Sequence, residues 1–130
     1  MVRLAILDEA INSQLQENPD GLGEVEVVFA GKDLPSLRRK GALSANAVVV
    51  DLNLLGEDPA RELDTIVDQC GAEMALVLYQ YAKRDLITRL SEGKSRALKV
   101  PVHLGGLRMH LLGLLVRDIF NANAPQGARA

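Results

Sequence analysis

Five short apolar runs alternate with helix-like segments along the chain, and this alternation constrains the fold more than any other feature. The apolar runs cover residues 2–7, 24–31, 45–53, 73–80 and 95–102. The helix-like segments cover residues 9–16, 32–41, 59–70, 83–93 and 104–120. Because parallel strands need long crossover connections, which helices usually supply, the pattern predicts an α/β fold. We expect a doubly wound, five-stranded parallel sheet with helices on both faces.

Local signals support the individual elements. The first run is apolar at almost every position, which is typical of a strand buried on both faces. Three consecutive valines, Val48–Val50, mark the centre of the third strand, because β-branched residues favour strands. Gly41 and Gly93 follow helix-like segments, where glycine commonly ends a helix. Pro59 opens another such segment, in the first turn, where proline is accepted.

The size and composition of the chain favour one domain of ordinary globular type. The chain has 130 residues, of which 48% are hydrophobic and 25% charged. We expect a single domain over residues 1–120. The remaining residues, 121–130, are polar or small. This composition predicts either a flexible tail or the start of a linker.

Charge and cysteine content exclude several functional classes. The formal net charge of −2 gives no indication of nucleic-acid binding. The sequence contains no run of about 18 apolar residues, so it predicts no membrane span. The single cysteine, Cys70, excludes an internal disulfide and fits a reducing compartment, so we expect a cytoplasmic protein with a buried thiol. Arg38–Lys40 is expected to be a solvated helix end. His103 and His110 have no cysteine or acid at ligand spacing, so they are interpreted as loop and helix-surface residues.

Acidic residues follow two of the predicted strands. Asp8 and Glu9 end the first strand, and Asp51 ends the third. Ligands of open parallel sheets bind beyond the carboxyl ends of the strands, where the strand order reverses. If these two strands are neighbours, three carboxylates converge, and such a group suits Mg²⁺. The alternative is that each acid only caps a helix. For three acids on two neighbouring strands, we favour the site.

The acidic pair in "LAILDEA" and the third strand in "NAVVVDLNLLGED" resemble the receiver domains of two-component response regulators. The resemblance extends from Val2 to about Phe120, and it implies a flavodoxin-like sheet in the order 2-1-3-4-5. It further implies that Asp51 accepts a phosphoryl group from a histidine kinase. The implied Mg²⁺ ligands are Asp8, Glu9, Asp51 and the backbone carbonyl of Asn53. A carboxylate is a known nucleophile for this chemistry.

Three switch positions of the receiver family differ in this chain. Where the family has Ser or Thr after the fourth strand, the alignment places Tyr79, followed by Gln80 in place of a small residue. Where the family has a lysine before a proline, this chain has Val100. Lys99 is one residue early and could substitute only through a bulge, because side chains alternate along a strand. The switch aromatic of the family is replaced by Ala97.

These differences predict an atypical receiver, or pseudo-receiver, in signal transduction. We expect weakened or absent phosphorylation switching, no enzymatic activity beyond self-phosphorylation or dephosphorylation at Asp51, and action through a signalling protein or histidine kinase. The first alternative is a phosphorylation-competent receiver that regulates an output domain, which could bind DNA. The second is an unrelated flavodoxin-like binding protein, although no Gly-rich phosphate loop follows the first strand.

The last helix-like segment carries an unusually wide apolar stripe. Its residues at helical spacing are Leu107, Leu111, Leu114 and Leu115. One interpretation is that the stripe only packs on the sheet. The other is a protein contact, with a homodimer through the face formed by the fourth helix, fifth strand and fifth helix. The domain itself is not expected to contact nucleic acid or membrane.

Overall fold

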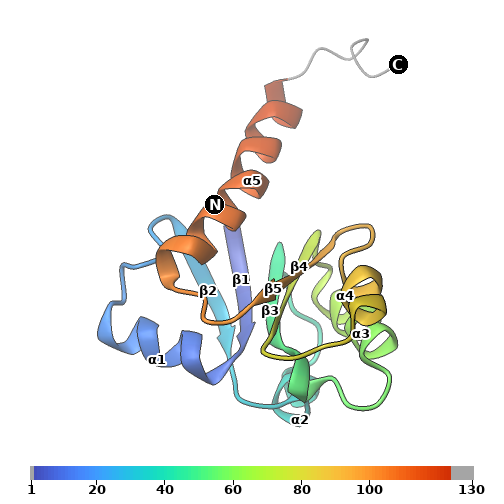
Figure 1. The fold of residues 1–130 in the computed structure, drawn as a ribbon. Helices are drawn as coiled ribbons and strands as arrows, with labels where there is room; N and C mark the ends of the chain where they lie inside the picture. Colours follow the sequence, from blue (N-terminus) through green and yellow to red (C-terminus); the bar gives the residue numbers. More distant parts are fainter. Residues whose placement is uncertain (1, 124–130) are drawn as a thin grey trace.

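The computed structural model describes the backbone of residues 2–123 and the side chains of residues 2–113. In chain order the elements are β1 (Val2–Leu7), α1 (Glu9–Glu17), β2 (Val25–Ala30), α2 (Leu34–Lys40), β3 (Ala47–Asp51), the 3₁₀ helix η1 (Leu52–Leu54), α3 (Pro59–Cys70), β4 (Met74–Tyr79), α4 (Arg84–Leu90), β5 (Ser95–Lys99) and α5 (Leu104–Asn123). The strands form one parallel sheet in the order β2-β1-β3-β4-β5 (Figure 1). The predicted flavodoxin-like α/β fold is confirmed.

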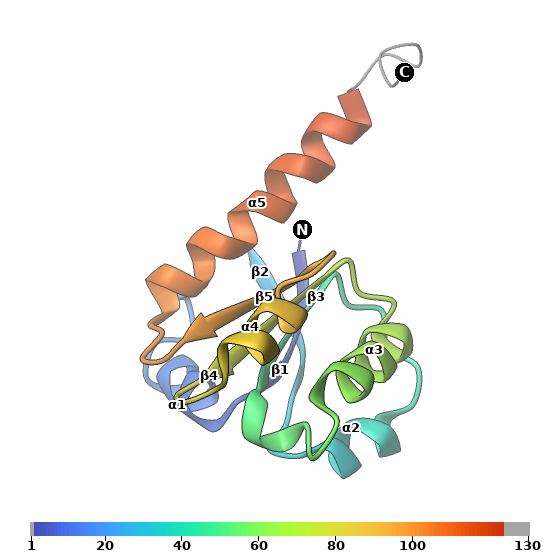
Figure 2. The same ribbon diagram turned by 45° about the vertical axis from the view of Figure 1, so that its right-hand side comes forward.

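Helices cover both faces of the sheet and create two separate cores. The α1/α5 core packs Ile11 of α1 and Leu107 of α5 against β1, β3 and β4. The α2/α3/α4 core packs helices α2, α3 and α4 against the other face, with Leu37, Leu63 and Leu90 among its buried residues (Figure 2). Alternate residues of each central strand enter opposite cores, which explains why these strands are apolar at nearly every position.

Several elements end at different residues from those predicted. The third strand stops at Asp51 instead of residue 53, because the chain turns there into η1. The fifth strand stops at Lys99 instead of residue 102, and a cis peptide bond joins Val100 to Pro101 just beyond it. Helix α5 continues to Asn123. Of the segment expected to be a tail or linker, residues 124–130 lie outside the described part of the chain.

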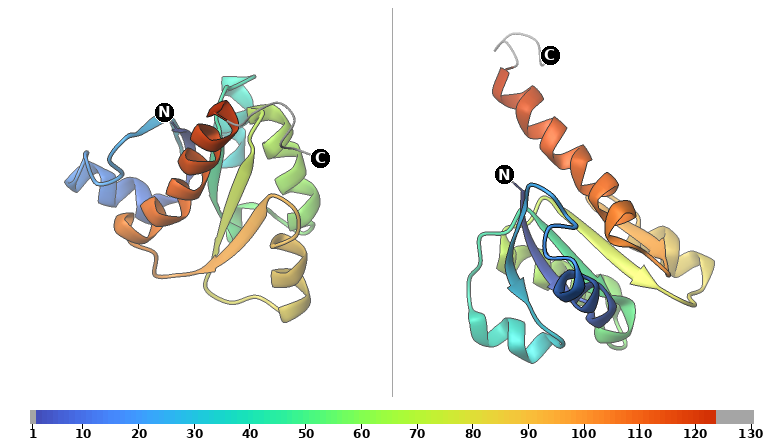
Figure 3. Two further views of the ribbon diagram at one scale, coloured as in Figure 1. Left: turned by 90° about the horizontal axis from the view of Figure 1, so that it is seen from above. Right: turned by 90° about the vertical axis from the view of Figure 1, so that its left-hand side faces the viewer.

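Helix α5 begins at the end of the sheet where the strands finish and runs back past the end where they begin. Figures 1 and 3 show its carboxyl-terminal part extending beyond the first residues of β1. Among the side chains that the structure describes in this helix, residues 104–113, those of Leu104, Leu107 and Leu111 are buried. Across residues 2–123, no helix has the length and hydrophobicity that a membrane crossing requires.

Two further predictions from the sequence concern Cys70 and the segment Arg38–Lys40, which lie in the α2/α3/α4 layer. Cys70 is a free cysteine, fully buried at the end of α3, and burial raises the pKa of its thiol, so the expectation of a buried, inert thiol is confirmed. Arg38–Lys40 form the exposed last turn of α2, as expected for a solvated helix end. Arg38 makes an ion pair with Glu62 of α3, which joins these two helices at the surface.

Candidate functional site

A cleft of about 410 Å³ opens at the carboxyl ends of the strands, beside the point where the strand order reverses. Its residues come from the ends of β1, β3 and β4, from α1, and from the loop between β5 and α5. They are Asp8, Ala10, Ile11, Gln14, Asp51, Leu78, Gln80, Val100, Pro101, Val102 and His103. The cleft therefore combines two carboxylates, two carboxamides and an imidazole with an aliphatic wall.

Asp8 is the buried acid of the cleft, with only 5% of its surface exposed. It is the N-cap of α1, and its carboxylate accepts a hydrogen bond of 2.9 Å from the Ile11 N–H. Burial raises the pKa of Asp8, the Ile11 hydrogen bond lowers it, and the negative charge of Asp51 raises it further, so that the net change is upward. The charge of Asp51 thus opposes ionisation of Asp8, an effect that a bound cation would relieve.

Asp51 is the last residue of β3 and is half-buried. Its carboxylate accepts a hydrogen bond of 3.0 Å from the Asn53 N–H, which caps η1. This bond turns the chain immediately after the strand and leaves Asn53 exposed. Asp51 therefore has a capping role, but it also faces the cleft together with Asp8. Both acids therefore cap a helix and also line the cleft, so a capping role does not exclude a site at these residues.

Glu9 does not share the cleft with the other two acids. As the first residue of α1 it lies beside a separate polar cleft of about 580 Å³, together with Asn12 and Lys32. Its charge still reaches Asp8, where it is the smallest of the causes that act on the pKa. Within residues 2–113, no three His, Cys, Asp or Glu side chains are grouped closely enough to hold a metal ion. The structure thus brings together two of the three expected carboxylates.

Of the three switch positions Tyr79, Ala97 and Val100, only Val100 lines this cleft. Gln80 and Val100 line it, whereas Tyr79 is half-buried beside Lys99 in the register of the two strands. Lys99 is exposed and lies at a different depression, with His103 and His110. No lysine or arginine is among the described residues that line the cleft. Ala97 is half-buried against the α2/α3/α4 core.

Two cleft residues were not singled out from the sequence as site residues. His103 was interpreted as a loop residue, and it is an exposed loop residue that also lines the cleft. Gln14 lies on α1 and binds the loop before α5, about 90 positions further along the chain. A glutamine in a polar helix position carries no sequence signal for such a distant contact, so only the structure reveals it.

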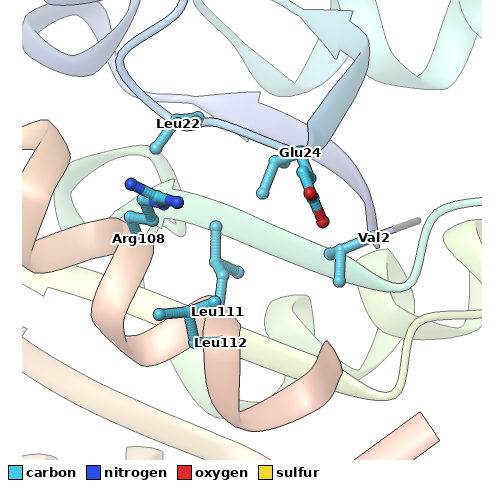
Figure 4. Close-up of a pocket in the computed structure, with 7 residues that line it drawn as sticks. Val2, Leu22, Glu24, Arg108, Leu111 and Leu112 are labelled. Carbon is cyan, nitrogen blue, oxygen red and sulfur yellow. The ribbon is translucent and has the colours of Figure 1, made fainter. Parts of the chain in front are cut away.

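A small apolar pocket lies between α5 and the starts of β1 and β2. In Figure 4, Arg108, Leu111 and Leu112 of α5 face Leu22 and Glu24 across it. The pocket holds only about 20 Å³, which is roughly the space that one water needs. It is therefore a packing gap at the edge of the α1/α5 core rather than a ligand site.

The residues expected at a protein interface have different positions in the structure. Leu107 and Leu111 are 0% and 1% exposed, and both pack into the α1/α5 core. Leu107 and Leu111 therefore pack on the sheet, which was the first of the two interpretations of the apolar stripe. The side chains of Leu114 and Leu115 lie outside the described residues. On the solvent side of the same helix, Met109 is 69% exposed.

The domain has the flavodoxin-like α/β fold, and solved receiver domains share this fold. The signal receiver domain of NarL from Mycobacterium tuberculosis has 16% sequence identity and a TM-score of 0.62, with 87% of this chain and 94% of that chain covered. The ChxR receiver domain from Chlamydia trachomatis has 18% identity and a TM-score of 0.55, with 89% and 99% covered. No protein-family model matches the sequence. A comparison with curated proteins gives no match either.

Proposed function

We propose that this chain is an atypical receiver domain that acts in signal transduction through protein contacts, with weakened or absent phosphorylation switching. The observation that carries the proposal is the composition of the cleft. Asp8 and Asp51 line it, but Val100 and Gln80 occupy the strand ends beside them, and no lysine or arginine is among the described lining residues. A phosphoryl group at Asp51 would therefore lack a lysine or arginine to stabilise its oxygens. We expect a cytoplasmic protein whose partner is a signalling protein or a histidine kinase.

The same residues fit a weakly held Mg²⁺ ion. This ion is usually bound by one or two carboxylates and keeps several waters, so Asp8 and Asp51 suffice without Glu9. The raised pKa of Asp8, caused first by burial and then by Asp51, indicates that the pair needs a counter-charge. The backbone carbonyl of Asn53, two residues after Asp51, is the third candidate ligand that the resemblance to receiver domains implies, although Asn53 is not among the residues that line the cleft. When bound, the metal would neutralise charge at the cleft and polarise a phosphoryl oxygen.

Amide spectra recorded by NMR during two successive titrations test the proposal. Mg²⁺ up to about 10 mM, well above ordinary site affinities, is expected to shift the amides near Asp8 and Asp51. Subsequent addition of beryllofluoride, a phosphate mimic, is expected to produce no further saturable change at Asp51 or Tyr79. Saturable changes at sub-millimolar mimic would instead support the phosphorylation-competent alternative.

Two single-site variants identify the metal ligands. Asp51→Asn is expected to abolish the Mg²⁺ response, whereas Glu9→Gln is expected to keep it, because Glu9 lines the other cleft. Loss of the response in Glu9→Gln would instead make Glu9 a ligand, as the family resemblance implies. If the wild-type protein does not respond to Mg²⁺ at all, the metal part of the proposal is refuted.

We further propose that the protein forms a homodimer through the face of α4, β5 and α5. A depression of about 300 Å³ lies on this face, and it is lined by Leu98 and Lys99 of β5 and by Gly106 and His110 of α5. Side chains of a second copy could enter it in a symmetric contact. The depression has apolar residues and an exposed surface around it. It is therefore the part of α5 that is available to a partner, whereas Leu107 and Leu111 are buried.

A pair of glycine variants tests the dimer. A Cβ atom at Gly106 meets no other atom within 4 Å, so Gly106→Arg places a long charged side chain in the depression without a clash in the domain itself. Gly105 is equally open and does not line the depression, so Gly105→Arg is the matched control. In sedimentation equilibrium, Gly106→Arg is expected to raise the dimer dissociation constant at least tenfold and Gly105→Arg to leave it nearly unchanged. A wild-type protein that stays monomeric at about 1 mM, a concentration at which even weak pairs associate, would contradict the dimer.

A further inference from the structure

Gln14 forms two hydrogen bonds across the domain that fix the loop between β5 and α5. Its side-chain Nε2 donates to the Val102 carbonyl at 3.1 Å. Its Oε1 accepts from the Leu104 N–H at 3.2 Å. Both bonds are partly buried and join α1 to a segment 88 to 90 residues further along the chain. One carboxamide therefore holds both sides of the peptide segment that leads into α5.

The Leu104 bond caps the start of α5 from another helix. Leu104 is the first residue of α5, and the first N–H groups of a helix have no partner within the helix. Gln14 supplies an acceptor for one of them from another helix. The order of the first turn of α5 therefore depends on the position of the Gln14 side chain.

The same side chain faces the acidic cleft. Gln14 lines it together with Asp8 and Asp51, and His103, the residue between the two peptide groups that Gln14 holds, lines it as well. The carboxamide N–H₂ group has two protons, and carboxylates attract such donors more strongly than neutral carbonyls do. A negatively charged cleft would therefore compete with the Val102 carbonyl for this group.

We propose that Gln14 couples the charge of the acidic cleft to the order of helix α5. When that charge is reduced, by a cation or by substitution of Asp51, the pull on the carboxamide weakens. Its bonds to Val102 and Leu104 then strengthen, and the first turn of α5 becomes more ordered. Through this coupling, the proposed dimer face of α4, β5 and α5 would respond to the charge of the cleft. The response would need neither the lysine nor the switch aromatic of the receiver family. A signalling role for this coupling rests on the proposed function. The coupling between the cleft and α5 can itself be tested independently of that function.

Amide hydrogen exchange at Leu104, measured by NMR on the full 130-residue chain, tests the coupling. Asp51→Asn is expected to slow exchange several-fold at Leu104 in the otherwise wild-type protein. In Gln14→Leu, exchange at Leu104 is expected to be about tenfold faster, the effect of losing one ordinary hydrogen bond, and to become insensitive to Asp51→Asn. Gln16→Leu, an exposed glutamine two residues away on the same helix, is the matched control and should behave as wild type.

A third variant separates the two hydrogen bonds. Gln14→Glu keeps an acceptor for the Leu104 N–H but cannot donate to the Val102 carbonyl while it is ionised. It is expected to retain the protection of Leu104 and to lose its dependence on Asp51. If the response to Asp51→Asn persists in Gln14→Leu, or is absent in the wild-type background, the coupling is refuted.

A Mg²⁺ arm distinguishes failure of the coupling from failure of the proposed metal site. Mg²⁺ should slow Leu104 exchange in the wild-type protein and not in Gln14→Leu, while it shifts the Asp8 amide in both. Absence of any shift at Asp8 refutes the metal site and leaves the Asp51→Asn result as the test of the coupling. A shift at Asp8 with no change at Leu104 refutes the coupling and leaves the metal site supported.

Discussion

Replacing Leu107 with alanine is expected to destabilise the domain by about 2–5 kcal/mol. Leu107 is 0% exposed and packs in the α1/α5 core, so the substitution removes buried apolar contacts and leaves a cavity beside the sheet. Of the variants considered for this protein, it should have the largest effect on stability. Urea unfolding followed by circular dichroism measures the change, provided that the slope of the transition stays constant.

Met109→Ala is the matched control for this prediction. Met109 lies two residues further along α5 and is 69% exposed. Its substitution should change the free energy of unfolding by no more than about 0.5 kcal/mol. Equal destabilisation by the two variants would show that both sides of α5 are buried in solution, for example in a dimer more extensive than the one proposed.

Asp8→Asn is expected to have the opposite effect to Leu107→Ala and to stabilise the protein at neutral pH. Burial, and then the charge of Asp51, raise the pKa of Asp8, so the ionised carboxylate is unfavourable in the folded state. Asparagine is neutral but caps a helix as well as aspartate does, so the bond from the Ile11 N–H can be kept. Asp8→Ala is the comparison, because it removes the charge and the cap together.

The pH dependence of this gain follows from the direction of the pKa change. Because the pKa of Asp8 is raised on folding, the folded state binds more protons than the unfolded state above the ordinary value of 3.8. The contribution of Asp8 to stability therefore falls as pH rises from that value through the raised pKa of the folded protein. Thermal unfolding of wild type and Asp8→Asn should give similar stabilities below this range and diverge above it. A gain that does not change with pH would contradict burial of the charge as its cause.

The alternation of five strands with helices could be predicted from the apolar runs of the sequence, whereas the order of the strands in the sheet was predicted from the resemblance to receiver domains. The ends of the strands were predicted less well. The run that contains Val48–Val50 continues as apolar residues beyond the true end of β3, but the Asp51 carboxylate caps η1 and turns the chain at that point. The fifth run includes Pro101, which cannot donate a hydrogen bond to a neighbouring strand, and β5 ends before it.

Which acids share a cleft could be predicted only in part. Asp8 and Asp51 were expected together because parallel strands end at the same edge of the sheet, and both line the cleft. Glu9 follows Asp8 directly, but successive residues of a helix point about 100° apart, so its side chain lies at the neighbouring cleft. The Gln14 contact joins segments that no local pattern relates. Adjacent positions in sequence were therefore a poor guide to side-chain direction at the start of α1.

The buried thiol of Cys70 has a practical consequence for studies of this domain. It lies in the α2/α3/α4 core, on the opposite side of the sheet from Leu107, and it is the single cysteine of the chain. A thiol reagent can reach it only when that core opens, so the rate of modification under native conditions reports the frequency of opening without an added label. Measured in Leu107→Ala, the same rate would tell whether damage to one side of the sheet loosens the other, and hence whether the two layers unfold as one cooperative unit.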